Sequence, residues 1–135
     1  MMSDERRFGN TPESVTQARR FAVMAVGSVP SDVAEAVAVM VSELATNSVR
    51  HAGTHFSVRV DREGARIRVA VADAGSGQPA IRSPRPHEPT GRGLRIVRAL
   101  ADEWGVAPLQ DGRGKVVWFT VDVAGREASL RDPAH

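Results

Sequence analysis

Three polar residues in the segment Val41–Gly53 recur at every fourth position of an otherwise apolar run rich in Ala, Val and Leu. They are Glu43, Asn47 and His51. On an α-helix this spacing stacks the three side chains along one face. A carboxylate, a carboxamide and an imidazole on a helix of core composition cost free energy unless each has a partner. Either the three side chains satisfy one another and the neighbouring strands, or they face a ligand.

The composition is that of an ordinary soluble globular protein. The chain has 135 residues, of which 41% are hydrophobic and 25% charged. We therefore expect one domain over residues 1–135, with an ordered core from about residue 6 to residue 123. No cysteine is present, which excludes a disulfide framework and a thiolate metal site. The charged amino terminus and the lack of any run near ~18 apolar residues predict a cytoplasmic protein without membrane contact.

The basic isoelectric point does not indicate nucleic-acid binding. The pI is about 10.3, yet the net charge at pH 7 is only +2. Because Tyr and Cys are absent, almost nothing titrates between the α-amine and the basic side chains. The basic residues, all Arg except Lys115, are spread through the chain among acidic ones. No basic stripe with interleaved aromatic residues is present, so we expect no direct contact with nucleic acid.

Two helices are predicted in the first half of the chain. Thr11-Pro12-Glu13 combines a capping hydroxyl, a proline at the first helical position and an acid in the first turn, and Gly27 ends this helix. Pro30-Ser31-Asp32 opens the second helix, which runs through Asn47 to a stop at Gly53. Its alanine-rich, mostly apolar surface predicts burial against a sheet.

Alternating patterns predict that sheet. Residues 55–61 and 66–72 alternate apolar and polar side chains on either side of a short turn, which indicates an antiparallel hairpin. An amphipathic helix over 93–101 precedes a strand that begins at residue 104 and a last strand over 115–123. The order predicts an α/β (α+β) two-layer sandwich, with a mixed, mostly antiparallel sheet and helices packed on one face.

The segment after residue 73 loses this periodicity and contains four prolines. A loop of this length in a small domain is typical of a functional lid. Before it, Asp73-Ala74-Gly75-Ser76-Gly77 sets a carboxylate at a strand end beside two glycines. This suits either the close approach of a ligand or a tight turn capped by Asp73. After it, Gly91-Arg92-Gly93-Leu94 opens a helix, where free N–H groups and the helix dipole favour a phosphate.

Simpler interpretations suit several other residues. Trp104 and Trp118 are expected in the core. Lys115, at the start of a strand, is expected to be a solvated edge charge. It does not belong to a P-loop, because no Ser or Thr follows it and no helix begins there. A metal shared by His51 and His55 is not expected, because a helix-ending glycine lies between them.

Three boxes in order carry a family resemblance. Glu-x-x-x-Asn-x-x-x-His-Ala, Asp-x-Gly-x-Gly and Gly-x-Gly-Leu, within about residues 10–123, resemble the GHKL, or Bergerat-fold, ATPase superfamily. That group includes gyrase, mismatch-repair ATPases and histidine kinases. The segments Val41–Asn47 and Gly91–Val97 look most like those of the bacterial anti-sigma-factor serine/threonine kinases. The resemblance implies a Bergerat ATP-binding fold, ATP and Mg²⁺ as ligands, and an ATP lid over residues 78–92.

The resemblance also implies a role for each matching residue. Glu43 would act as general base toward an attacking hydroxyl, Asn47 would ligate Mg²⁺, and Asp73 would bind the adenine amino group. His51 would hold the helix end or the lid at the nucleotide, and Thr120 would reach the adenine side. The remaining matches would let the base approach or offer groups to the phosphates; they are Gly75, Gly77, Gly91, Arg92, Gly93 and Leu94.

A partner-switching kinase is the function that this resemblance implies. The protein would bind a sigma factor, act as a homodimer, and phosphorylate a Ser or Thr of an antagonist (anti-anti-sigma) protein. Kinase members often carry a lid arginine close before the Gly-x-Gly, where this chain has Pro89 and Thr90, so Arg92 or Arg85 would have to substitute. The first alternative is an ATP-binding partner-switch module without significant kinase activity. A detached histidine-kinase catalytic domain ranks lower, because no dimerisation helix pair or phosphoacceptor segment is recognisable.

Overall fold

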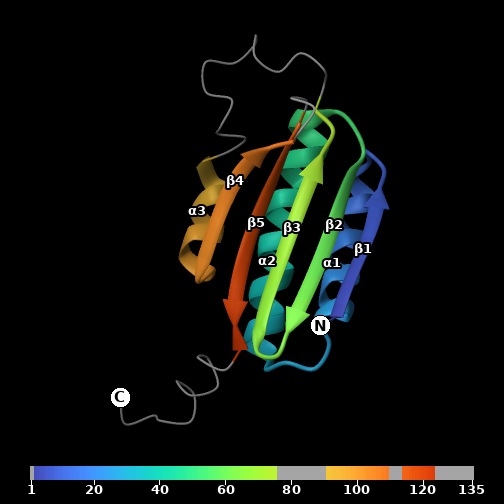
Figure 1. The fold of residues 1–135 in the computed structure, drawn as a ribbon. Helices are drawn as coiled ribbons and strands as arrows, with labels where there is room; N and C mark the ends of the chain where they lie inside the picture. The colour runs from blue at the N-terminus through green and yellow to red at the C-terminus, as the bar shows by residue number, and fades with distance from the viewer. Residues whose placement is uncertain (1, 76–90, 110–113, 124–135) are drawn as a thin grey trace.

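A two-layer arrangement of helices on a sheet is seen in the computed structural model, which describes residues 2–75, 91–109 and 114–123 (Figure 1). The elements, in chain order, are β1 (Met2–Phe8), α1 (Pro12–Val26), α2 (Ser31–Asn47), η1 (Ser48–Ala52), β2 (Phe56–Glu63), β3 (Arg66–Asp73), α3 (Gly91–Leu100), β4 (Glu103–Pro108) and β5 (Lys115–Asp122). The five strands form one sheet in the order β1-β2-β3-β5-β4. The helices lie behind the sheet in Figure 1, and its front face is open.

The predicted fold class is confirmed. Every strand pair among the described residues is antiparallel, whereas the prediction allowed some parallel pairing. The short hairpin makes the β2–β3 pair antiparallel, and the more distant pairs, β1 with β2 and both β3 and β4 with β5, also run in opposite directions. One domain over residues 1–135 stays a prediction, since its last residues lie outside the described ranges.

The core fills the space between the helices and the inner face of the sheet. Met40 of α2 and Phe56, Val69 and Phe119 of the strands are fully buried there. Along each strand only every second residue faces the helices, so the alternation seen in the sequence becomes one apolar face. Burial of a side chain of this size stabilises the folded state by about 1.5–3 kcal/mol.

The second helix differs from its prediction at its carboxyl end. The expected continuous α-helix to Gly53 is replaced by α2, which ends at Asn47, and by a single π turn, η1. Gly53, with φ of 69°, ends the π turn in the left-handed conformation. Because a π turn is wider than an α turn, it rotates the residues after Asn47 away from the expected stack. Such turns are frequent at functional sites.

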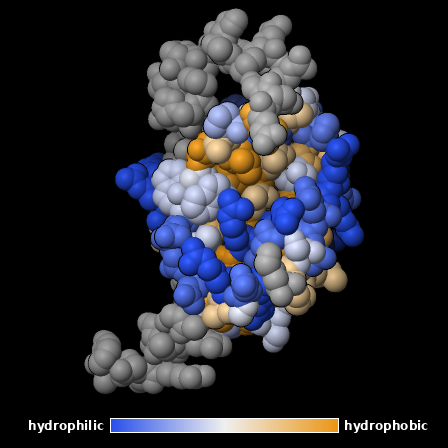
Figure 2. Space-filling model, in the orientation of Figure 1, coloured by the Kyte–Doolittle hydropathy of each residue, from blue (hydrophilic) through white to orange (hydrophobic). Residues whose placement is uncertain are grey.

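Neither tryptophan belongs to the core, contrary to the prediction. Trp104 lies opposite Phe119 and therefore on the helix-facing side of the edge strand β4. Trp104 is 36% exposed. Trp118 is half-buried on the open face of the sheet, where the Arg68 guanidinium lies 4.9 Å from the centre of its ring. Gly105 makes room for that ring, because a Cβ there would come within 2.7 Å of it. Figure 2 shows this face as largely hydrophilic, with a smaller apolar area toward its upper part.

An arginine ties the β2–β3 hairpin to the first helix. Arg62 donates from Nη1 to the carbonyl oxygens of Val26 and Ser28, at 2.7 and 3.1 Å, and from Nε to that of Gly64 at 3.1 Å. A cation at the carboxyl end of a helix donates hydrogen bonds to the free carbonyl groups there and interacts favourably with the helix dipole. The helix layer is thereby attached to the hairpin end of the sheet.

Candidate functional site

The carboxylate of Asp73 stands at the carboxyl end of β3 on the inner face of the sheet. It is 5% exposed and lies opposite Phe56 of β2. Its Oδ1 accepts a hydrogen bond from the Gly75 N–H at 3.1 Å. Gly75 has φ of 71°, a conformation that glycine adopts without strain. The segment therefore forms the capped turn that the sequence allowed, and it also leaves Oδ2 for another partner.

That partner is Lys115, the first residue of β5. Its Nζ lies 3.0 Å from Asp73 Oδ2, and the two side chains are 23% and 4% exposed. The prediction of a solvated edge charge is wrong, because the register places Lys115 directly opposite Asp73 on the inner face. The preceding Gly114 permits this approach: its φ is 81°, and a Cβ on it would lie 2.1 Å from the Asp73 carbonyl oxygen.

Asn47 reaches the same place from the end of α2. It is 5% exposed, and its Nδ2 has no hydrogen-bond partner in the described part of the chain. A cavity of about 10 Å³, the space of roughly one water molecule, is lined by Asn47, Asp73 and Lys115, with Leu44, Val71 and Val117 as apolar walls. A buried amide without a partner costs free energy, so the cavity has the polar character of a place for a ligand group.

Glu43 and His51 lie on either side of Asn47 along the chain, but they differ in burial and in position relative to the cavity. Glu43 is half-buried on α2 and precedes Asn47 by four residues, so both share one helix face. His51 is exposed on the π turn and is not among the residues that line the cavity. Of the predicted three-residue stack, only Glu43 and Asn47 keep the expected relation.

Thr120 is not brought to this site. It is buried on β5, but Lys115, Val117 and Phe119 alternate with it and face the helices. Since successive side chains of a strand point to opposite faces, Thr120 faces the open side of the sheet. It pairs in register with Arg68 of β3, at the end of the strand remote from Asp73. The structure therefore separates Thr120 from this cavity in both face and position, and its contact with adenine stays a prediction.

The remaining predicted residues belong to the lid and to the start of α3. The helix begins at Gly91, slightly earlier than the predicted start at residue 93, and the backbone N–H groups of its first turn have no partners within the helix. The backbone of Gly93 lies in this first turn. Gly77 and lid residues 78–90 lie outside the described residues, as do the side chains of Arg92 and Leu94.

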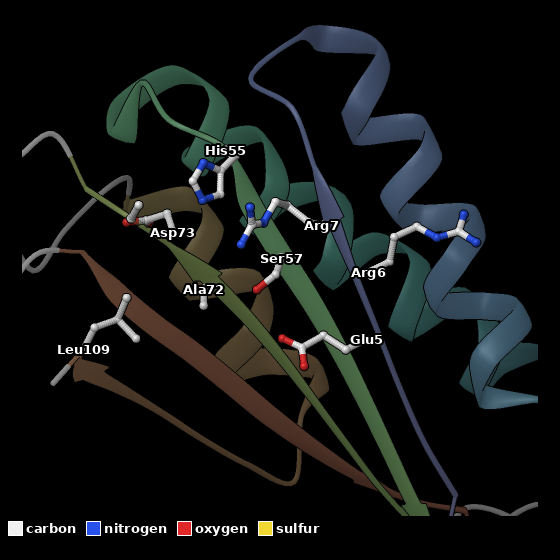
Figure 3. Close-up of a pocket in the computed structure, with 9 residues that line it drawn as sticks. Glu5, Arg6, Arg7, His55, Ser57, Ala72, Asp73 and Leu109 are labelled. Atoms are coloured by element: carbon white, nitrogen blue, oxygen red, sulfur yellow. The ribbon is translucent and has the colours of Figure 1, made fainter. Parts of the chain in front are cut away.

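A second, larger hollow of about 390 Å³ opens beside the same strand end (Figure 3). Glu5 and Arg7 of β1, His55, and Ser57 of β2 line it, and Asp73 also belongs to its lining. Figure 3 shows these side chains arranged along neighbouring strands rather than around one point. The smaller cavity, in contrast, brings together Asn47 and Asp73, two of the residues that the sequence singled out, so we place the candidate site there.

Among the described residues, a divalent cation would need oxygen ligands from a bound molecule as well as from the protein. Within residues 2–75, 91–109 and 114–123 no group of three His, Cys, Asp or Glu side chains could hold a metal ion. Magnesium, however, is commonly bound through one or two protein oxygens together with phosphates and waters. Asn47, which is buried and lines the cavity, would hold Mg²⁺ in this way through its carboxamide oxygen.

The comparison with known families agrees with this geometry. Residues 8–121 match the family described as the histidine kinase-like ATPase domain. The chain belongs to this family. The resemblance to the GHKL superfamily is thus confirmed, and with it a fold suited to ATP binding. No protein among the curated sequences matches the chain. Among the described helices of this ATPase domain, none is long and apolar enough to cross a membrane.

Proposed function

We propose that this histidine kinase-like ATPase domain binds Mg·ATP and phosphorylates a Ser or Thr of an antagonist protein in a partner-switching system. One observation carries the nucleotide site: Asn47 and Asp73, far apart in the sequence, line one cavity at the end of the sheet. The family of the chain supports ATP as the ligand. The choice of a protein hydroxyl as phosphate acceptor rests on the resemblance of Val41–Asn47 and Gly91–Val97 to anti-sigma-factor kinases.

Each residue has a defined role in the proposed reaction. Asp73 would accept a hydrogen bond from the adenine amino group, and Asn47 would hold Mg²⁺, whose charge would offset that of the phosphates. The hydroxyl oxygen of the substrate attacks the γ-phosphorus, the bond to the β–γ bridging oxygen breaks, and ADP leaves. Glu43, one turn from Asn47, takes the hydroxyl proton. The helix start at Gly91 offers amides to the phosphates, whose charge must be neutralised during transfer.

The proposed partners are a sigma factor and its antagonist, an anti-anti-sigma protein, with a homodimer as the working form. An ATP-binding module without significant kinase activity is the alternative, favoured by Pro89 and Thr90 at the lid positions where kinases often carry arginine. A detached histidine-kinase catalytic domain ranks below both. The first two differ in one respect only, which is transfer of the γ-phosphate.

Thermal unfolding with and without Mg·ATP tests the nucleotide site. A ligand at 100 times its Kd stabilises a protein by about 2.7 kcal/mol, which raises the Tm of a domain of this size by several degrees. We expect this rise for the wild-type protein and its loss in Asp73→Asn, which removes the carboxylate acceptor. If ATP leaves the Tm of the wild-type protein unchanged, the nucleotide site is refuted.

Transfer of labelled γ-phosphate to purified antagonist proteins tests the kinase. Loss of a positioned general base lowers a rate by about 10²–10⁴-fold, so Glu43→Gln should abolish phosphorylation while keeping the ATP-dependent rise in Tm. Glu35→Gln is the matched control, because Glu35 is exposed on the same helix and should leave transfer intact. ATP binding by the wild-type protein without transfer to any antagonist would favour the partner-switch module.

A further inference from the structure

The ion pair between Lys115 and Asp73 has features that a merely structural pair does not need. Lys115 is the only lysine of the chain, and every other basic residue is Arg. Its ammonium group is turned to the inner face, where it meets a carboxylate that is 4% exposed. Burying such a pair gains little stability over well-packed apolar residues, because both charges lose hydration. Its place at the candidate adenine site suggests another use.

The surroundings of the pair are incompletely satisfied. Among the residues that the structure describes, Asn47 Nδ2 has no hydrogen-bond partner, although Asn47 is only 5% exposed and lines the same cavity as both charges. The Lys115 ammonium has three donors, and one of them is directed to Asp73 Oδ2. Two donors remain for a group that enters beside the carboxylate. A ligand edge placed there meets an acceptor and a donor side by side.

We propose that Lys115 recognises adenine by donating a hydrogen bond to ring atom N1, beside Asp73, which accepts from the N6 amino group. The inference rests on the proposed binding of ATP and adds a specificity-determining residue to that site. N1 is an acceptor and is next to the carbon that carries N6, so the donor–acceptor edge of adenine complements the acceptor–donor pair. Hydrogen bonds from a charged donor are the stronger kind.

The same pair disfavours 6-oxopurines. In guanine and hypoxanthine the positions are reversed, with an oxygen acceptor at C6 and an N1–H donor. In the orientation of adenine, the C6 oxygen would face the Asp73 carboxylate and the N1–H would face the Lys115 ammonium. The first contact would bring two hydrogen-bond acceptors together and the second would bring two donors together. A site that complements adenine in this way therefore binds a 6-oxopurine much more weakly. We expect ITP to bind more weakly than ATP.

Nucleotides with single ring atoms exchanged test the assignment in the unmodified protein. The analogue 1-deaza-ATP lacks the N1 acceptor, and 3-deaza-ATP is the matched control that keeps it. Calorimetry should show 1-deaza-ATP to bind on the order of tenfold more weakly than ATP, with 3-deaza-ATP close to ATP, since a charged hydrogen bond is lost in one case only. Labelling with ¹³C-lysine gives signals from Lys115 alone, which should move with ATP and much less with 1-deaza-ATP.

Two variants complete the test. Lys115→Met should bind ATP and 1-deaza-ATP equally, whereas Arg66→Met, which removes an exposed cation of another ion pair, should keep the wild-type preference. Equal binding of ATP and 1-deaza-ATP by the wild-type protein overturns the assignment of Lys115 and leaves ATP binding standing. No binding of ATP at all overturns both. If Lys115→Met does not fold, the analogues and the lysine signals of the wild-type protein still decide.

Discussion

The two ends of β3 have the same kinds of residue in different surroundings. At the hairpin end, Arg66 pairs with Glu103 at 2.7 Å, and at the other end Asp73 pairs with Lys115 at 3.0 Å. The first pair is exposed by 59% and 62%, and the second by 23% and 4%. The exposed pair keeps most of its hydration and contributes little to stability. The buried pair loses hydration, so each charge depends on its partner for compensation. The degree of burial therefore distinguishes the ion pair at the hairpin turn from the ion pair at the candidate site.

A positive-φ glycine also marks each end. Gly64 in the β2–β3 turn has φ of 60° and no atom within 4 Å of the place of a Cβ. Gly114 has φ of 81° and lies against the backbone of Asp73 and Ala74. At the hairpin end glycine is needed for the turn alone. At the site end it is needed both for conformation and for the contact that brings Lys115 to the carboxylate.

The largest contrast is expected from alanine at these two glycines. Gly114→Ala has two unfavourable effects: the new Cβ overlaps backbone atoms, and alanine is strained at this positive φ. Together they should lower the free energy of unfolding by about 3–4 kcal/mol. Gly64→Ala has the second effect only, about 1–2 kcal/mol. Urea denaturation measures both. Equal losses would show that the close packing at Gly114 contributes nothing.

An intermediate contrast is expected from neutralising one carboxylate of each pair. Asp73→Asn leaves the poorly exposed Lys115 with a neutral partner, and should cost about 1–3 kcal/mol of stability. Glu103→Gln acts on a solvent-screened pair, so its cost should stay under about 1 kcal/mol. The same denaturation curves, repeated in high salt, should show that only the second effect is screened. A reversed order would remove the distinction between the two ends.

The smallest effect is expected from Asp61, in the hairpin half of the sheet. The hydrogen bond from Ser3, followed by that from Arg59, holds the pKa of the Asp61 carboxyl below its ordinary value. A lowered pKa in the folded state adds stability that is complete above the ordinary value of 3.8 and is lost as the pH falls through the folded pKa. Ser3→Ala should reduce this acid-sensitive stability slightly and leave ATP binding unchanged. NMR titration of the Asp61 carboxyl should show a lowered pKa in the wild-type protein and a rise toward the ordinary value in Ser3→Ala.

Local signals predicted much of this fold. The start at Thr11-Pro12 and the stop at Gly27 matched α1, and the alternation over 66–72 matched β3 within one residue. These features depend on neighbours a few residues away, which a sequence window contains. The π turn after Asn47 has no comparable local mark, because its residues suit an α-helix equally well. Only packing distinguishes the two, and so His51 was misplaced.

The candidate site was predicted in part for the same reason. Asp73 and Asn47 were recognisable because each stands in a motif of its own. Lys115 was missed, although two signals were present: it is the sole lysine, and its alternation with Val117 and Phe119 puts it on the inner face. Thr120 was assigned to the adenine side, yet the same alternation places it on the open face. Strand phase was the usable signal in both cases.

By itself the sequence determined where the helices and strands lie and which residues of each strand share a face. Those properties follow from periods of two and 3.6 residues and from the conformations that proline and glycine allow. Only the tertiary structure decided that Lys115 lies opposite Asp73, and that Asn47 reaches them from α2. Register between distant strands depends on the whole buried face, since a shift of one residue would turn every side chain of β5 to the other side.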